Sequence, residues 1–120
     1  MAKVVVLGAS PKPERYSFQA ITRLLAAGHE VIPVNPRGGE IQGLTVLPDL
    51  SSLSLGIDTL TLYVGPELLR GVVAEVLRMR PKRIIFNPGT ESTEEESLFS
   101  ARGIEVVKGC TLVMLAEGTF

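Results

Sequence analysis

Short apolar runs recur along this chain, and most are separated by stretches in which apolar residues have a helical repeat. The runs are rich in β-branched residues and do not alternate with polar ones, which is typical of strands buried on both faces. Strands of this kind form parallel sheets, because the helices between them cross over and cover both faces. The expected strands are residues 3–7, 31–34, 59–64, 83–86 and 104–107.

Three helices are expected between these strands. The first begins near Ser17 and ends before Gly28, since glycine readily takes the left-handed backbone that closes a helix. The second begins at Gly65-Pro66, because proline is favoured in the first helical turn. The apolar stripes are Phe18, Ile21, Leu24 and Leu25 in the first helix and Leu69, Val72, Val73, Val76 and Leu77 in the second.

The third helix is expected at residues 94–102, where Thr93 and Glu96 have the spacing of a capping box and Gly103 stops the helix. The alternation of strands and helices predicts one α/β domain, residues 1–120, with three layers doubly wound around a mainly parallel sheet of about five strands. The other segments are expected to be a loop at 37–48 with a short strand at 45–47, a helical turn near 48–53, and an apolar tail at 110–115.

Composition limits the class of function. The 12 basic and 13 acidic side chains give a net charge of −1, so no global field favours nucleic acid or anionic membrane. No apolar run approaches the roughly 20 residues of a membrane helix. The single cysteine excludes an internal disulfide framework, and the first strand leaves no room for a signal peptide. We therefore expect a cytoplasmic domain that binds neither nucleic acid nor membrane.

The most informative stretch is residues 4–17, with the sequence VVVLGASPKPERYS. A buried strand runs into Gly8, and a basic loop then leads to the start of a helix near Ser17. Unpaired backbone N–H groups and the helix dipole converge at such a junction, and Lys12 and Arg15 add positive charge. This stretch favours a phosphate-bearing, nucleotide-like ligand.

Ligands of parallel α/β sheets bind at the carboxyl ends of the strands, near the point where the winding reverses. Four segments follow strands at that edge, and their small, polar or turn-forming residues let the backbone approach a ligand closely. We expect ligand contacts among Gly8, Ala9, Ser10, Lys12, Pro13, Arg15, Tyr16, Ser17, Asn35, Pro36, Arg37, Val64, Gly65, Pro66, Asn87, Pro88 and Gly89.

The first loop departs from the dinucleotide-binding fingerprint, because only the first glycine of that pattern is present. The second strand ends in Asn35, where an NAD site usually has Asp or Glu against the ribose hydroxyls, and Arg37 lies close by. An arginine there suits a ribose that carries a phosphate, as in NADP or coenzyme A. Plain NAD is disfavoured.

No catalytic or metal-binding group is indicated. His29 is the only histidine and follows the glycine that ends the first helix, so it forms no Ser–His or Cys–His pair at the ligand edge. One histidine and one cysteine do not make a metal site. Two interpretations of Cys110 stay open: a buried small hydrophobe, or an exposed thiol that lies near a bound ligand.

Four segments together resemble the small stand-alone coenzyme A-binding proteins, relatives of the coenzyme A-binding domain of the succinyl-CoA ligase α subunit. They are VVVLGASPKPERYS, VIPVNPRGGEIQGLTVLPDL, NPGTESTEEE and GIEVVKGCTLVML, which cover nearly the whole chain. The resemblance implies a Rossmann-like fold with coenzyme A across the strand ends. It implies that Gly8, Ala9, Ser10, Lys12, Arg15 and Ser17 lie near the phosphates, Asn35-Pro36-Arg37 near the adenosine, and Val64-Gly65-Pro66 and Asn87-Pro88-Gly89 along the rest of the cofactor.

We therefore expect a non-catalytic protein that binds coenzyme A or an acyl-CoA. The first alternative is a protein that binds NADP or another phosphorylated nucleotide and acts with an oxidoreductase partner. The second is an interaction domain whose pocket has lost its ligand.

Overall fold

The computed structural model describes all 120 residues, and the expected α/β fold with a five-stranded parallel sheet is confirmed. The strands lie in the order β2-β1-β5-β6-β7, and neighbouring strands pair in parallel. Each one is four or five residues long, and the three in the middle of the sheet, β1, β5 and β6, are almost fully buried. Their bounds are β1 (Lys3–Leu7), β2 (Glu30–Val34), β5 (Thr59–Leu62), β6 (Arg83–Phe86) and β7 (Glu105–Lys108).

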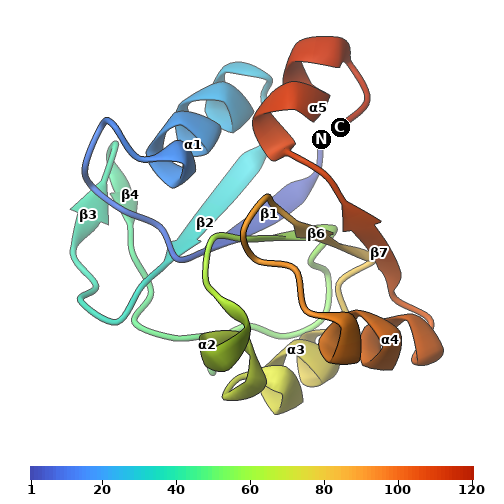
Figure 1. Ribbon diagram of the computed structural model, residues 1–120. Helices are drawn as coiled ribbons and strands as arrows, with labels where there is room; N and C mark the ends of the chain where they lie inside the picture. The colour runs from blue at the N-terminus through green and yellow to red at the C-terminus, as the bar shows by residue number, and fades with distance from the viewer.

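Helices cover both faces of this sheet (Figure 1). One face carries α1 (Tyr16–Ala26) and α5 (Thr111–Glu117), and the other carries α2 (Pro66–Arg70), α3 (Val73–Met79) and α4 (Thr93–Ala101). The core is accordingly divided in two by the sheet. Because successive strand side chains point to opposite faces, Val4 and Val6 pack with α1, whereas Val5 and Leu7 pack in the cluster of the other face.

Three elements differ from the sequence expectation. The stripe after Pro66 belongs to two short helices, since the chain leaves helical geometry at Val72, next to the poor helix former Gly71. The loop at 37–48 contains an antiparallel hairpin, β3 (Glu40–Ile41) and β4 (Leu44–Thr45), and Leu47 only bridges to Val34. The apolar tail forms α5, which packs against α1.

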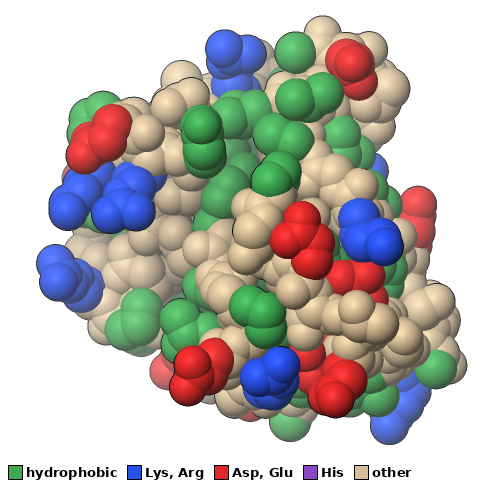
Figure 2. Space-filling view, viewed as in Figure 1, with side chains coloured by type: hydrophobic (Ala, Val, Ile, Leu, Met, Phe, Trp, Pro, Cys, Tyr) green, Lys and Arg blue, Asp and Glu red, His purple; other side chains and the backbone are tan.

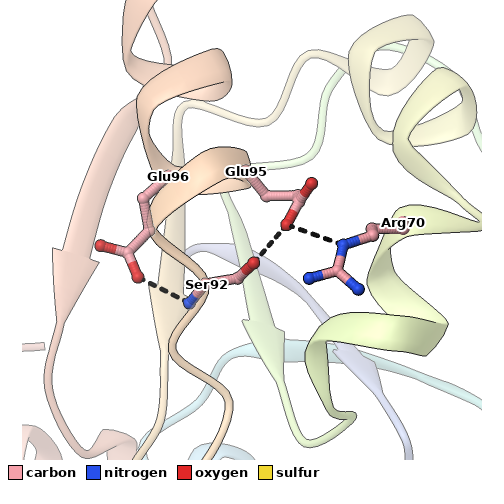
Figure 3. Close-up of polar contacts among 4 residues, drawn as sticks. All are labelled: Arg70, Ser92, Glu95 and Glu96. Atoms are coloured by element: carbon pink, nitrogen blue, oxygen red, sulfur yellow. Dashed lines mark hydrogen bonds and ion pairs between the residues drawn. The ribbon is translucent and has the colours of Figure 1, made fainter.

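The N-cap of α4 lies one residue before the predicted position. The N-cap is Ser92 instead of Thr93: its amide donates to Glu96 Oε2 at 2.8 Å, and its hydroxyl donates to Glu95 Oε1 (Figure 3). Glu95 also lies 3.7 Å from Arg70 Nε at the end of α2. The carboxylates of its own first turn therefore lie at the α4 N-terminus and bind the N-cap residue.

The chain changes direction at β1. It runs through α1 to β2 on one side of β1, and then returns past the hairpin to β5 on the other side. In open α/β sheets the crevice at such a reversal, outside the carboxyl ends of the strands, is the usual ligand site. The loops after β1, β2 and β5 are therefore the ones to consider. No helix has the length and apolar character needed to cross a membrane.

Candidate functional site

An apolar cleft of about 170 Å³ opens at this reversal. It lies between the ends of β1 and β2, the segment after the hairpin, and the start of α2. Most of its wall is hydrocarbon, and Asp49 is its one charged residue. The lining residues are Leu7, Gly8, Val34, Asn35, Pro36, Pro48, Asp49, Leu50, Val64, Leu68 and Val72.

A cationic cup of about 340 Å³ adjoins the cleft. Lys12, Arg15 and Arg37 line it, no carboxylate does, and none of the three is in an ion pair within the protein. Figure 2 shows a group of basic side chains beside the loop that leads into α1. The cup and the cleft share Asn35 and Pro36, so they form one continuous site with an apolar and a cationic part.

Asn35 holds the two loops of this site together. Its Nδ2 donates to the Ala9 carbonyl at 2.9 Å, and its Oδ1 accepts the Arg37 amide at 2.7 Å. Its own amide donates to the Leu47 carbonyl at 3.0 Å. Because both polar atoms of its side chain are paired in this way, Asn35 shapes the junction of cleft and cup through the backbone of its neighbours.

Gly8 is required by the close packing of the strand ends. Its φ is +93°, and a Cβ at this position would lie 2.7 Å from the Tyr63 carbonyl oxygen. The amides of Gly8 and Ala9 both donate to the Val34 carbonyl, at 3.0 and 3.1 Å. These two amides are therefore occupied, and the donors left for an anion lie further along the loop.

Free donors are present at the N-terminus of α1. Its N-cap is Arg15, no side chain caps it, and its first turn contains no acidic residue. The amides of residues 16–18 have no acceptor within the protein. Unpaired amides, the helix dipole and the side chains of Lys12 and Arg15 all favour an anion in this place.

The structure brings together about half of the predicted contact residues. Gly8, Ala9, Ser10, Lys12, Arg15, Asn35, Pro36, Arg37 and Val64 line the cleft or the cup. Pro13 and Tyr16 are exposed next to the cup, whereas Ser17 is buried under it. Gly65 and Pro66 begin α2 beside the cleft without lining it.

The turn after β6 lies outside both parts of the site. Asn87 is buried, and its Nδ2 donates to Thr61 Oγ1 at 2.7 Å and to the Leu62 carbonyl at 2.8 Å. Its Oδ1 accepts the Thr111 amide at 2.9 Å. The Asn87 side chain thus joins β5, β6 and α5, and the ligand contacts expected at Asn87-Pro88-Gly89 stay a prediction.

The sequence analysis missed the wall formed by residues 48–50. The helical turn expected near 48–53 is not formed: this stretch is irregular, and its one backbone–backbone hydrogen bond runs from the Leu53 amide to the Leu50 carbonyl. Bonds from the Ser51 hydroxyl and amide lower the pKa of Asp49, whose carboxylate is exposed at the rim. Pro48-Asp49 directly after an apolar run was the available signal, since these residues favour turns.

Other reactive groups lie away from the cleft and the cup. Cys110 is half-exposed at the start of α5, so the thiol is not a fully buried hydrophobe. The pKa of nearby Tyr63 is raised to about 12, mainly by burial. His29 is at the amino end of β2, the opposite edge of the sheet, where Nδ1 accepts the Ala2 amide at 3.2 Å and the ring packs on Phe120. No group of three His, Cys, Asp or Glu residues could hold a metal ion.

One of the comparisons with known proteins identifies a family. A family model described as a CoA binding domain matches residues 2–116. YneT of Bacillus subtilis (strain 168), an uncharacterized protein, is 28% identical over 105 residues, which are 88% of this chain and 78% of YneT. The crystal structure of an uncharacterized protein is 47% identical with a TM-score of 0.95, and the match covers 100% of this chain and 98% of that chain. A Thermus thermophilus structure, cell-free ID.343, is 30% identical with a TM-score of 0.90, over 99% of this chain and 90% of that chain. The resemblance inferred from the sequence is confirmed: this chain belongs to the CoA-binding domain family.

Proposed function

We propose that this protein binds coenzyme A, or an acyl-CoA, at the carboxyl edge of its sheet. The observation that carries the proposal is the continuity of the apolar cleft with the carboxylate-free cationic cup through Asn35 and Pro36. Coenzyme A has a flat adenine base on a ribose, and this ribose carries both a 3′-phosphate and a pyrophosphate. One ligand of this kind presents an apolar group and several anionic groups at short separation.

In the proposed complex the adenine enters the cleft, and the phosphates lie in the cup against Lys12, Arg15, Arg37 and the free amides of α1. The three cations are unpaired in the protein, so no internal ion pair has to break when the phosphates bind. The pantetheine then leaves the site along the ends of β5 and β6. Membership of the CoA-binding domain family supports coenzyme A over other phosphorylated nucleotides.

We propose further that the protein has no catalytic group of its own. The one histidine is engaged with the Ala2 amide and Phe120 at the amino edge of the sheet, so it forms no Cys–His pair with Cys110 at the start of α5. An acid, base or nucleophile must reach the reacting atoms to act in catalysis. Chemistry on a bound acyl-CoA would therefore need a second protein.

Calorimetric titration with coenzyme A, dephospho-coenzyme A and NADP tests the ligand. We expect saturable binding of coenzyme A that weakens when the 3′-phosphate is missing, because one charged contact is lost. Tight binding of NADP without a response to coenzyme A would favour a phosphorylated-dinucleotide protein instead. Absence of heat with all three ligands at millimolar concentration would refute the proposal and favour an interaction domain.

A further inference from the structure

One wall of the apolar cleft is hydrogen-bonded to the rest of the protein through a single side chain that lies outside the cleft. Residues 48–56 contain no helix or strand, yet Pro48, Asp49 and Leu50 line the cleft. The hydrogen bonds between this stretch and the rest of the protein both come from Arg78, on α3. Nη1 donates to the Leu53 carbonyl at 2.9 Å, and Nη2 donates to the Leu50 carbonyl at 3.1 Å.

The geometry points to Arg78 as a positioning residue for the ligand, an inference that rests on the proposed function. Arg78 does not line the cleft, so it acts through the backbone of Leu50 and Leu53. A guanidinium is a planar fork with donors at a fixed separation, so it sets the distance between the two carbonyls that it binds. A lysine at the same position has one compact ammonium group and cannot reproduce the fork.

The remaining attachments of the wall do not replace this fork. The side chains of Leu50 and Leu53 pack in the core of the α2, α3 and α4 face, and Leu47, just before the segment, is bonded to the backbone of Pro33 and Asn35. None of these contacts is a polar contact to the backbone of residues 48–56. The bonds between Asp49 and Ser51 stiffen the turn only within itself. Arg78 is thus the polar link that fixes where the Pro48–Leu50 backbone stands relative to the opposite wall at Val64 and Leu68.

This placement gives Arg78 a selective effect on the ligand. The cup is built on the loops after β1 and β2 and has no contact with residues 48–56 among its lining residues. Loosening the wall therefore weakens the grip on the part of the ligand in the cleft and leaves the phosphate contacts in place. A residue that only supported overall stability would affect both parts equally.

The test compares Arg78→Lys with Arg23→Lys, a matched control on an exposed arginine of α1 whose side chain makes no hydrogen bond or ion pair. We expect Arg78→Lys to raise the Kd for coenzyme A about tenfold, as for the loss of one charged hydrogen bond, and Arg23→Lys to leave it unchanged. In amide hydrogen exchange, coenzyme A should slow exchange at both residues 8–18 and residues 48–56 of the natural protein. In Arg78→Lys it should slow exchange at residues 8–18 only.

Two results would overturn the inference while the proposed function stands: equal Kd values for the two variants, or equal loss of ligand protection in both segments of Arg78→Lys. A natural protein that shows neither heat nor protection with coenzyme A would overturn the proposed function, and the inference with it. The thermal midpoints of both variants, measured without ligand, exclude partial unfolding at the temperature of the titration.

Discussion

The N-termini of α1 and α4 are alike as secondary structure but differ in the charge of the residues around them. At α1 the cap is Arg15, the first turn has no acidic residue, and the amides of residues 16–18 are unpaired. At α4 the first turn is Glu94-Glu95-Glu96, and the cap Ser92 is bonded to two of these carboxylates (Figure 3). One helix end is open to an external anion, and the other already has its anions.

The difference indicates that a helix N-terminus is available to a ligand only where the sequence leaves it vacant. The dipole and the unpaired amides are properties of every helix. At α4 the carboxylates are also neutralised by basic partners, Arg70 at 3.7 Å from Glu95 and Lys108 at 3.8 Å from Glu96. At α1 the charges have the reverse arrangement, with unpaired cations and no acid, and in the proposed complex a phosphate completes it.

The largest expected effect concerns the loop that leads into α1. We expect Gly8→Ala to lower the free energy of unfolding by on the order of 3 kcal/mol, since the new Cβ combines a positive φ with overlap of the Tyr63 carbonyl. Gly39→Ala is the control, because its φ of +87° is similar but no atom lies within 4 Å. Urea unfolding of both variants gives the measurement. Equal losses would show that packing against β5 does not hold this loop.

A buried or half-buried acidic group lies on each face of the sheet, Glu95 at α4 and Tyr63 after β5. Alkaline pH tests the second of them. Glu95 is buried beside Arg70, whereas burial raises the pKa of Tyr63 from 10.0 to about 12. Above pH 10 the phenol ionises in the unfolded chain but keeps its proton in the folded one, so stability falls as pH rises toward 12. The loss is on the order of 2 kcal/mol for this group. Urea unfolding between pH 9 and pH 12 should show a shallower decline in Tyr63→Phe; the same slope in both proteins would contradict the assignment.

The cations of the cup provide the next test. Lys12→Ala and Arg37→Ala should each weaken binding of coenzyme A by about 1–3 kcal/mol, the usual size of a charge-assisted contact, with little change in folding. Arg23→Ala removes an exposed arginine from the far end of α1 and should leave the affinity unchanged. Titration calorimetry measures all three. If neither Lys12→Ala nor Arg37→Ala changes the affinity, the phosphates are not in the cup.

The smallest effects on stability are expected when a carboxylate is added to the first turn of α1 or removed from the first turn of α4. Tyr16→Glu places a carboxylate in the open first turn of α1 and should stabilise the fold by about 0.3–1 kcal/mol. The same carboxylate should repel a phosphate and weaken coenzyme A binding about tenfold. Glu94→Gln is the control: it removes an exposed carboxylate from α4 and should cost a few tenths of a kcal/mol without changing the affinity. Thermal denaturation and titration of both variants would detect the opposite signs of the two effects in Tyr16→Glu.

The sequence predicted the sheet well because its strands carry their own signal. Residues 4–7 and 84–86 are continuous apolar runs, and a run of this kind is typical of a strand buried on both faces. The ends of α1 and α4 were also predicted, since Gly28 and Gly103 have φ values of +87° and +81°. Failures occurred where the signal was short. The hairpin β3-β4 has two residues per strand, and α5 is an apolar run without a visible helical stripe.

The site was predicted in part for the same reason. Loops that directly follow strands were found, because every strand end in a parallel sheet lies at one edge. The wall at Pro48–Leu50 follows an isolated bridge at Leu47 and was not found. Asn87 was predicted to contact the ligand because it is a polar residue at a strand end. The three hydrogen bonds of its side chain instead join β5, β6 and α5.

The sequence by itself determined the layers, the parallel sheet and the vacancy at the start of α1, because these depend on residues that are close together in the chain. Only the tertiary structure decided which loops meet. Asn35 joins the loop after β2 to the loop after β1, and Arg78 attaches the cleft wall across 25 and 28 residues of sequence. A cleft is a property of surfaces from distant segments, and local pattern does not record the packing that brings such surfaces together.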